Sequence, residues 1–460
     1  LDITGRNDWS STLPKDEWSY FFPSASASFI FSDALKINPD VLSFGKLRVA
    51  WAEAAVPPDP YQVNFTYATS PFAGQLGTML PSALPAAHYK PQINTTQDIG
   101  LTLGFLKNRL NLDLRYYHGR TKNQILSSPL PISSGVSSVV ISEGELENSG
   151  MEFTLNTKIA DGPNFKWDIS INGSHNSNKL LSLAPGATKV DLGSVWGDGG
   201  AHGPDISVKV GDQFGTIYGY DYTYDPKTGL PILIQNPFGK SEMNGTLYQA
   251  TSTLVPIGNA NPKFIGGMTN TFSFKNGISV GVLIDTKLGG DMWSGTYATM
   301  MSQGLAPETL KERNGGGLPY VTPNGTKTNW GVILPGVFPD GTVNTNVVHY
   351  YYKYMQYGVW SSSGIGGSDW IDKTSIFKNN YVKMREISIN YTLPQTFVQR
   401  SKIFQAATVS LVGRDLFYIY SSLPDNINPE GMNGVGNAQG IEFASMPSFR
   451  SLGFQVRLSF

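Results

Sequence analysis

The sequence contains no cysteine, so it can form neither a disulfide framework nor a thiolate metal site. Charged residues are also scarce, at 15% of 460 residues, against about a quarter in ordinary soluble domains. The formal net charge is -1, which argues against a nucleic-acid surface because such a surface needs a basic stripe. These shortages exclude three broad classes: disulfide-stapled proteins, thiolate metalloproteins and nucleic-acid binders.

Long hydrophobic runs are absent as well. No stretch reaches the roughly eighteen consecutive apolar residues of a membrane-spanning helix, so helical spans are excluded. Hydrophobic residues nevertheless make up 40% of the chain, 50 Gly and 29 Pro give frequent turns, and 9 Trp, 22 Tyr and 24 Phe supply many aromatic rings. This composition suits strands with apolar atoms outward, uncharged polar atoms inward and aromatic girdles at membrane interfaces.

Motifs of enzymatic chemistry are missing. There is no zinc-binding HExxH, no phosphate-binding Walker loop, no nucleophile elbow and no dinucleotide fingerprint. The five histidines are scattered without paired spacing, at His88, His118, His175, His202 and His349. The sequence therefore predicts no enzyme, no catalytic residue, no cofactor and no bound metal.

Two loops resemble oxygen-ligand cation sites only weakly. One places Asp221, Asp225 and Gly229 in the run DYTYDPKTG, where the alternative is a strand end followed by a turn. The other places Asp425, Asn428 and Glu430 in a single loop. Neither spacing is specific enough to predict a bound ion.

The last residues of the chain alternate strictly between apolar and polar. Alternation at period two predicts a strand with one face of each kind. A soluble sheet gives the same pattern, but about ten residues is also the length of a tilted strand that crosses a bilayer. Gln455 and Arg457 are predicted to face the lumen. The residues predicted to face the membrane are Leu452, Phe454, Val456, Leu458 and Phe460.

Four hairpins are predicted from similar alternation. They pair Gln97–Phe105 with Arg109–Gly119, Met151–Ile159 with Lys166–Ser174, Asp205–Val210 with Phe214–Tyr224, and Phe264–Phe274 with Ile278–Lys287. A further strand at Asn380–Tyr391 has a parity fault, because Val382 and Met384 alternate out of step with Ile387 and Ile389. Either a β-bulge near Arg385 and Glu386 or a wrong strand boundary explains the fault.

Short and long connections alternate along the chain, as periplasmic turns and extracellular loops do in outer-membrane barrels. The long loops fall near 54–96, 120–150, 175–204, 225–263, 288–379 and 414–447. A structureless loop of some ninety residues would be anomalous in a compact soluble domain. We therefore predict an all-β fold, an antiparallel transmembrane β-barrel with about fourteen strands here and a periplasmic C-terminus.

Aromatic residues of the long loops are the candidate ligand contacts. Aromatic faces with nearby polar groups suit sugars or peptides, since stacking supplies contact area and polar groups fix orientation. Packing within the loops, or contact with a partner, is the alternative for any single ring. The candidates are Trp196, Tyr350, Tyr352, Tyr354, Trp360 and Trp370.

Several short segments, in order along the chain, resemble the barrel of SusC/RagA-like TonB-dependent transporters. They are GRNDWSSTLP at 5–14, NQIL at 123–126, NSGME at 148–152, IYGY at 217–220, PIGNANP at 256–262, VKMREIS at 382–388 and GRDLF at 413–417, followed by the terminal strand. In the last of these the family usually has Asn where this chain has Asp415, a minor departure.

The resemblance implies the C-terminal part, over 1–460, of a 22-stranded outer-membrane barrel whose plug is absent from this chain. It further implies a SusD-like lipoprotein lid, energy from TonB–ExbB–ExbD through the missing N-terminal region, and a dimer of transporter–lipoprotein pairs. The implied function is multi-pass outer-membrane import of a glycan, oligosaccharide or peptide. The first residues already alternate as a strand, so we expect further strands between Leu1 and the terminal strand.

Two other functions remain open on the sequence. A fourteen-stranded barrel could be complete in itself and act as a passive outer-membrane channel. Alternatively, the chain could be a secreted β-rich protein that binds carbohydrate or mediates adhesion, with its apolar strand faces buried against a second sheet.

Overall fold

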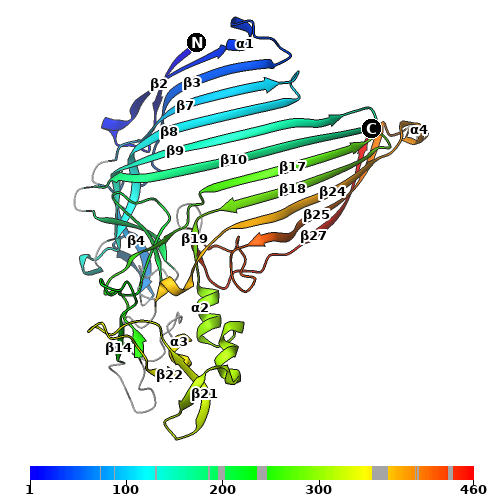
Figure 1. Ribbon diagram of the computed structural model, residues 1–460. Coiled ribbons are helices and arrows are strands. Elements are labelled where there is room, and N and C mark those ends of the chain that lie inside the picture. Colours follow the sequence, from blue (N-terminus) through cyan, green and yellow to red (C-terminus); the bar gives the residue numbers. More distant parts are fainter. Residues whose placement is uncertain are drawn as a thin grey trace.

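One large curved sheet dominates the computed structural model (Figure 1). The structure describes residues 1–460 except 73, 87–88, 130–131, 185–186, 195–202, 236–245, 355–370, 399, 401–402 and 434–438. Within the described residues the sheet has 13 strands, of which the short β6 (Ala83–Leu84) pairs in parallel with β9 and lies off the main path. The other strands form an antiparallel path in chain order, confirming the predicted all-β class.

The strands of this path differ widely in length. They are β1 (Asp2–Trp9), β2 (Ser19–Ile30), β3 (Leu42–Val56), β7 (Gln92–Phe105), β8 (Leu110–Pro129), β9 (Ser138–Asp161), β10 (Phe165–Ser182), β17 (Phe264–Phe274), β18 (Ile278–Leu288), β24 (Tyr381–Thr392), β25 (Ala406–Ser421) and β27 (Ser451–Ser459). Several are far longer than the roughly ten residues that cross a bilayer, so they continue beyond it.

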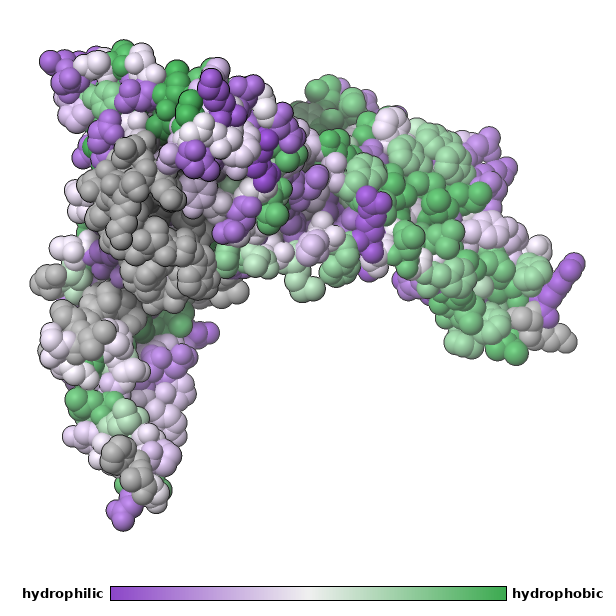
Figure 2. Space-filling model, turned by 90° about the horizontal axis from the view of Figure 1, so that it is seen from below, coloured by the Kyte–Doolittle hydropathy of each residue, from purple (hydrophilic) through white to green (hydrophobic). Residues whose placement is uncertain are grey.

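Strand register places the apolar side chains on one face. A cross-strand row on β2, β3, β7, β8 and β9 consists of Phe29, Leu47, Leu101, Leu114 and Phe153. A second row on β17, β18, β24, β25 and β27 consists of Phe272, Val280, Ile389, Leu411 and Phe454. Hydrophobic residues gather on the right-hand arm of the molecule, which carries the last strands (Figure 2). One continuous apolar face is the outer surface of a membrane barrel.

The predicted tight turns are present at one end of the sheet, where the C-terminus also lies (Figure 1). Leu106, Lys107 and Asn108 have φ of 54°, 58° and 60° and join β7 to β8. Gly277, with φ of 87°, closes the turn between β17 and β18. At the same end the ring of Phe460 lies 5.2 Å from that of Phe404. Three of the four predicted hairpins therefore lie in the large sheet.

The remaining predicted hairpin forms, but in a separate sheet. Strands β11 (Lys189–Ser194), β12 (Asp205–Lys209), β13 (Thr216–Gly219) and β16 (Val255–Asn259) make a four-stranded sheet of their own. The large antiparallel path consequently has twelve strands, where the sequence suggested about fourteen. Alternation alone could not distinguish these strands, because a small sheet that covers a core has the same period as a barrel strand.

The long connections are also more ordered than expected. Strands β8 and β9 run on through most of 120–150, so their connection narrows to 130–137; β10 likewise extends to Ser182, inside 175–204. The expected loop 414–447 begins only after Ser421, where β25 ends. Cross-strand pairing continues beyond the apolar belt into polar segments, whose sequence does not alternate and therefore did not predict strands.

The other connections fold into small sheets. They contain β4 (Ala68–Phe72) with β5 (Gln75–Met79); β14 (Leu233–Gln235) with β15 (Thr246–Tyr248); β20 (Leu318–Val321), β21 (Lys327–Ile333) and β22 (Val347–His349); and β19 (Asp291–Ser294) between β23 (Ile376–Lys378) and β26 (Ile441–Glu442). These lie at the end of the sheet opposite to the tight turns (Figure 1).

Helices are few and short among the described residues. The α-helices are α1 (Phe31–Ala34), α2 (Gly295–Ser302), α3 (Tyr351–Tyr354) and α4 (Gln395–Val398). Single helical turns occur at η1 (Lys15–Glu17), η2 (Ile132–Ser134), η3 (Pro307–Thr309), η4 (Glu312–Gly316) and η6 (Asp372–Ser375). In this part of the chain, no helix has the length and apolar character needed to cross a membrane.

Most of the buried core lies among the loops, and one cluster also includes Leu180 of β10, packed with Val190, Val208 and Phe214. Another cluster joins Ile206 and Ile217 of the four-stranded sheet to Trp293, Ala298 and Ile441. The apolar face of the large sheet instead stays open, with Phe454 67% and Leu411 57% exposed. A soluble sandwich would cover such a face, because leaving it in water costs roughly 25 cal/mol per Å².

The two outermost strands of the sheet do not meet. Strand β27 pairs with β25, and β1 pairs with β2; within the described residues neither has a second partner. Pairing of the terminal strand with residues 1–6 would close the barrel within this chain, and no such pairing is present among the described residues. An unpaired strand edge is untenable in hydrocarbon, since each free backbone group costs about 2–7 kcal/mol.

Candidate functional site

Charged side chains gather on the face of the sheet opposite to the apolar rows. Arg48 Nη2 lies 3.0 Å from Asp113 Oδ1, linking β3 to β8. Arg115 Nη1 lies 3.3 Å from Glu152 Oε2, and its Nε pairs with Asp98. An ion-paired face behind an apolar face is the arrangement of a barrel wall between lumen and lipid.

Strand β24 has a bulge at Arg385. In its ladder with β18, Leu283 pairs with Glu386 and Ile284 with Met384, so Arg385 is the extra residue. The predicted bulge near Arg385 and Glu386 is thus confirmed, and the parity fault is not a boundary error. Lys383 and Arg385, two residues apart, lie on the charged face and reach the same carboxylate, while the bulge returns Ile387 to the apolar face.

That carboxylate belongs to Asp415 of β25. Its Oδ1 lies 2.8 Å from Lys383 Nζ and 2.5 Å from Arg385 Nη1. Asp415 has φ of 52°, a left-handed conformation that Asn and Asp adopt more readily than other side chains. The departure from the usual Asn therefore keeps the backbone geometry and adds a negative charge between two cations.

Two further carboxylates complete the cluster. Arg385 Nη2 lies 2.5 Å from Asp285 Oδ2 of β18 and 2.5 Å from Glu430 Oε1. Glu430 also pairs with Lys383. Burial opposes ionisation of Glu430, but its hydrogen bonds to Arg385 and Lys383 prevail and lower the pKa of its carboxyl.

A cavity of about 710 Å³ lies beside this cluster. Strands β24 and β25 contribute Lys383, Asp415 and Tyr418 to its lining, and the segment between β25 and β27 contributes Asn428 and Glu442. Its volume falls within the range of about 300–1,000 Å³ that ligand pockets usually have. A polar ligand could therefore sit between the inner wall and the loops.

A second cavity, of about 460 Å³, has an aromatic lining. Tyr320, His349 and Tyr351 form its walls, together with Thr322 and Asn324 of the turn after β20. The rings of Tyr320 and His349 meet edge to face with centroids 5.5 Å apart. Burial lowers the pKa of His349, so this lining is uncharged at neutral pH.

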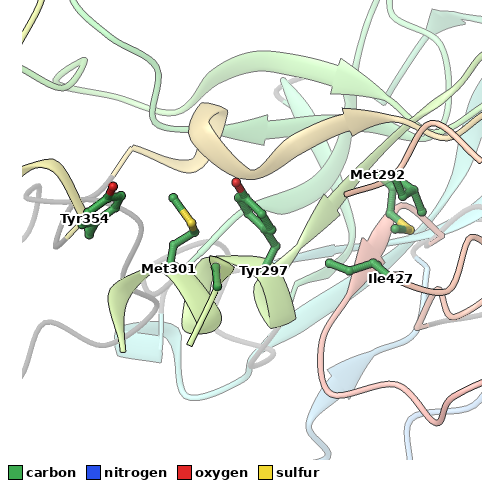
Figure 3. Packing of buried hydrophobic residues seen from close by; sticks show 7 residues of the cluster. Met292, Tyr297, Met301, Tyr354 and Ile427 are labelled. Atoms are coloured by element: carbon green, nitrogen blue, oxygen red, sulfur yellow. The ribbon is translucent and has the colours of Figure 1, made fainter. Parts of the chain in front are cut away.

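The predicted aromatic contacts occupy different environments. Tyr352 and Tyr354 are only 2% exposed and pack in the cores of the loop assembly. Tyr354 lies in line with Met301 and Tyr297 (Figure 3), and its hydroxyl donates to Glu312 Oε2 at 2.7 Å. Tyr350 is half-buried against both cores. Trp196, Trp360 and Trp370 lie outside the described residues.

Several oxygens of the two weak cation loops have other partners, whereas Oδ2 of Asp425 is buried without a hydrogen bond to the described residues. Asp225 Oδ2 accepts from the backbone N–H of Thr228 at 2.8 Å and from its hydroxyl at 2.7 Å, which is a turn cap. Asn428 Oδ1 accepts from the Tyr418 hydroxyl at 2.9 Å. Glu430 is held by the two cations of β24. These oxygens thus stabilise turns and the loop contact with β24.

Sequence reasoning did not identify Lys383, Arg385 and Asp415 as site residues. A signal existed, because the cations Lys383 and Arg385 lie at or beside the parity fault. Bulges often redirect a side chain in this way. The partner of these cations, Glu430, is 45 residues away from Arg385 in the chain, so no local pattern could pair them.

Comparison with known proteins gives consistent matches. The family described as TonB dependent receptor-like, beta-barrel matches residues 1–179. The TonB-dependent receptor P3 of Formosa agariphila is 24% identical over 479 residues, covering 100% of this chain and 44% of that protein. The TonB-dependent receptor SusC of Bacteroides thetaiotaomicron is 30% identical over 291 residues, covering 60% of this chain and 28% of that protein.

Among solved structures, the RagAB peptide transporter matches with a TM-score of 0.69 and 18% identity, covering 100% of this chain and 45% of that chain. The chain thus spans less than half the length of the relatives that match it over its whole length. Shared sequence segments and a shared curved sheet lead to one conclusion. Residues 1–179 match the TonB-dependent receptor-like β-barrel family, and the whole chain is similar in sequence and fold to part of the barrel of TonB-dependent receptors, SusC and RagA-type proteins among them.

Proposed function

We propose that the protein containing this chain actively imports a nutrient across the outer membrane, driven by TonB. The carrying observation is the cavity of about 710 Å³ between the charged wall and a loop assembly with its own buried core. Folded loops that enclose a cavity suit capture of a solute before release inward. In this proposal, displacement of a plug supplied by the rest of the protein then admits the solute to the periplasm.

The proposed partners are those of the SusC/RagA-like transporters that the chain resembles. A SusD-like lipoprotein covers the loops from outside, and TonB–ExbB–ExbD acts through the region that precedes this part of the barrel. Two such transporter–lipoprotein pairs form a dimer. The C-terminus, at the end of the sheet with the tight turns, is periplasmic, and the small sheets at the opposite end are extracellular.

The substrate is a glycan, an oligosaccharide or a peptide. The aromatic cavity offers uncharged rings and the amide of Asn324, a combination that suits a sugar ring or an apolar peptide side chain. In the proposed site Tyr351 and His349 contact ligand, whereas Tyr352 supports them from the core. Tyr350, Trp196, Trp360 and Trp370 remain predicted ligand contacts.

Growth of a deletion strain on single nutrient sources tests this function. Loss of growth on one glycan or peptide source, restored by the intact gene but not in a strain without TonB, is the expected result. Growth that is restored equally well without TonB would instead show a passive channel.

The secreted alternative makes a different prediction. An adhesin or carbohydrate-binding protein would leave cells without detergent, whereas a barrel needs detergent to leave the membrane. The exposed apolar face of β25 and β27 favours the barrel, because no second sheet covers it within the described residues.

A further inference from the structure

Four contacts from the wall converge on the carboxylate of Glu430. Arg385 Nη2 donates to Oε1 at 2.5 Å, and Arg385 Nη1 donates to Oε2 at 3.4 Å. The hydroxyl of Tyr418 donates to Oε2 at 3.1 Å, and Lys383 Nζ donates to the same oxygen. Two cations and a phenol around one carboxylate are the donor set of a carboxylate-binding site.

The site requires an anion. The side chain of Lys383 is only 3% exposed, and removing a partner from a buried charge is strongly destabilising. Asp285 and Asp415 hold part of the positive charge, but both belong to strands of the sheet and stay in place. Lys287 of β18 is also buried nearby in the wall. Without Glu430, three cations would face two carboxylates.

Glu430 differs from Asp285 and Asp415 in the part of the fold that carries it. It lies on the segment between β25 and β27, not on a strand of the wall. That segment has other attachments: Asn379 Nδ2 donates to the carbonyl of Pro429 at 2.8 Å, and β26 pairs with β19. The side chain of Glu430 can therefore leave its partners while the segment as a whole stays docked.

The vacated position would open onto the cavity of about 710 Å³, because Lys383 and Tyr418 both line it. A ligand in the cavity can thus present a carboxylate to the same donors. The lining also contains Asn428 and Ser445, which can hydrogen-bond neutral parts of such a ligand.

We propose that Lys383, Arg385 and Tyr418 form a receptor for a substrate carboxylate, and that Glu430 of the same chain occupies it when no substrate is bound. This inference rests on the proposed import function and narrows it to an acidic substrate. The carboxylate belongs either to a uronic acid in an oligosaccharide or to the C-terminus of a peptide. An internal competitor lowers the apparent affinity for substrate by the fraction of molecules whose receptor is free.

The test measures binding to the full-length protein purified in detergent. The probes are trigalacturonic acid beside its uncharged methyl ester, and N-acetyl-trialanine beside its C-terminal amide. In the wild type, one charged probe should bind at least about tenfold more tightly than its neutral counterpart, a difference of about 1.4 kcal/mol. Which pair shows the difference identifies the source of the carboxylate. Equal binding within both pairs, or no binding of either acid, overturns the proposal without any variant.

Two substitutions then test separately whether Glu430 competes with the ligand and whether Lys383 binds it. Glu430→Gln removes the competing charge and should tighten binding of the preferred acid by about tenfold, with no change for its neutral counterpart. Lys383→Met should weaken binding of the acid selectively. A matched control is Glu386→Gln, because Glu386 pairs with Arg414 at 2.8 Å and does not line the cavity. Unchanged or weaker acid binding by folded Glu430→Gln protein would overturn the internal competitor.

Failure here is distinguishable from failure of the import function. TonB-dependent growth on a neutral nutrient, without selective acid binding, would keep import and remove the carboxylate receptor. Absence of TonB-dependent growth on every source would remove the import function itself.

Discussion

Single residues show how closely the loop assembly is fitted. Gly219 lies in the IYGY segment, and a Cβ at that position would be 2.8 Å from Cβ of Asp372. No larger residue fits there unless η6 moves. Asp372 in turn accepts the backbone N–H of Tyr220 at 2.8 Å. The glycine therefore permits a buried carboxyl to cap the backbone beside it.

The buried position of Asp372 predicts a pH dependence. Burial raises the pKa of its carboxyl to about 7, against about 3.9 when unfolded. Between these values the folded state holds a proton that the unfolded state has lost, so stability falls as pH rises. Asp372→Asn should therefore stabilise this region at pH 8 by up to roughly 4 kcal/mol and have little effect at pH 4.

Hydrogen exchange of the Tyr220 amide measures this effect. Wild type should exchange faster than Asp372→Asn at pH 8, and the ratio of their rates should approach one near pH 4. A ratio that stays the same across this range would mean that Asp372 does not change its protonation there.

The terminal strand gives a second prediction at the residue scale. Val456 lies in the apolar parity of β27 and pairs with Val409 of β25. Val456→Arg should destabilise the barrel by about 2–4 kcal/mol if the side chain lies near the bilayer midplane. The fraction of folded, heat-modifiable protein in membranes measures assembly. Gln455→Arg, on the opposite face, is the matched control, and an equal loss from both variants would contradict the assignment of the faces.

At the scale of the element, β24 shows how one extra residue serves two purposes. The bulge at Arg385 keeps Met384 and Ile387 in the apolar parity on either side of it. It also adds the guanidinium of Arg385, which pairs with Asp285 and Glu430, to the charged face. A strand without the bulge could not hold Arg385 and also keep the apolar side chains before and after it on the lipid-facing side.

Single-residue deletions test this account. Deleting Arg385 should restore regular alternation, so the barrel should assemble, while the segment 422–450 should become more sensitive to protease. Deleting Ser388 should instead put Ile387 and Ile389 on opposite faces and reduce the folded fraction severalfold or more. Equal assembly of the two deletion variants would contradict the bulge as the point where the register changes.

At the scale of the whole molecule, the tight turns and the small sheets lie at opposite ends (Figure 1). The absence of cysteine from the chain allows this topology to be tested with single introduced thiols. Asn324→Cys lies in an exposed turn of the loop assembly, and Asn276→Cys lies in the tight turn between β17 and β18.

A membrane-impermeant maleimide should label Asn324→Cys on intact cells that lack the lipoprotein lid, and should label Asn276→Cys only after permeabilisation. The opposite pattern would invert the predicted orientation. Labelling of both positions on intact cells would contradict a membrane-spanning sheet between them.

Alternating side chains were enough to predict the apolar face and the tight turns, and they located the parity fault for which a bulge was one of two explanations. These features depend on neighbours within a few residues, because strand period and turn chemistry are local properties. The same rule failed at the strands β12 and β13, whose alternation serves a small sheet. It also could not tell that β8 and β9 extend beyond the membrane, since pairing in water requires no apolar pattern.

The sequence by itself thus determined a membrane-facing antiparallel sheet and its similarity to TonB-dependent receptor barrels, because period, composition and short ordered segments need no spatial partner. Only the tertiary structure decided which loop residues are core and which can meet a ligand. Tyr352 and Tyr354 are buried, whereas Glu430 reaches Lys383 and Arg385 across a long loop. Charge pairing and burial depend on distance in space, and residues far apart in the chain acquire that distance only on folding.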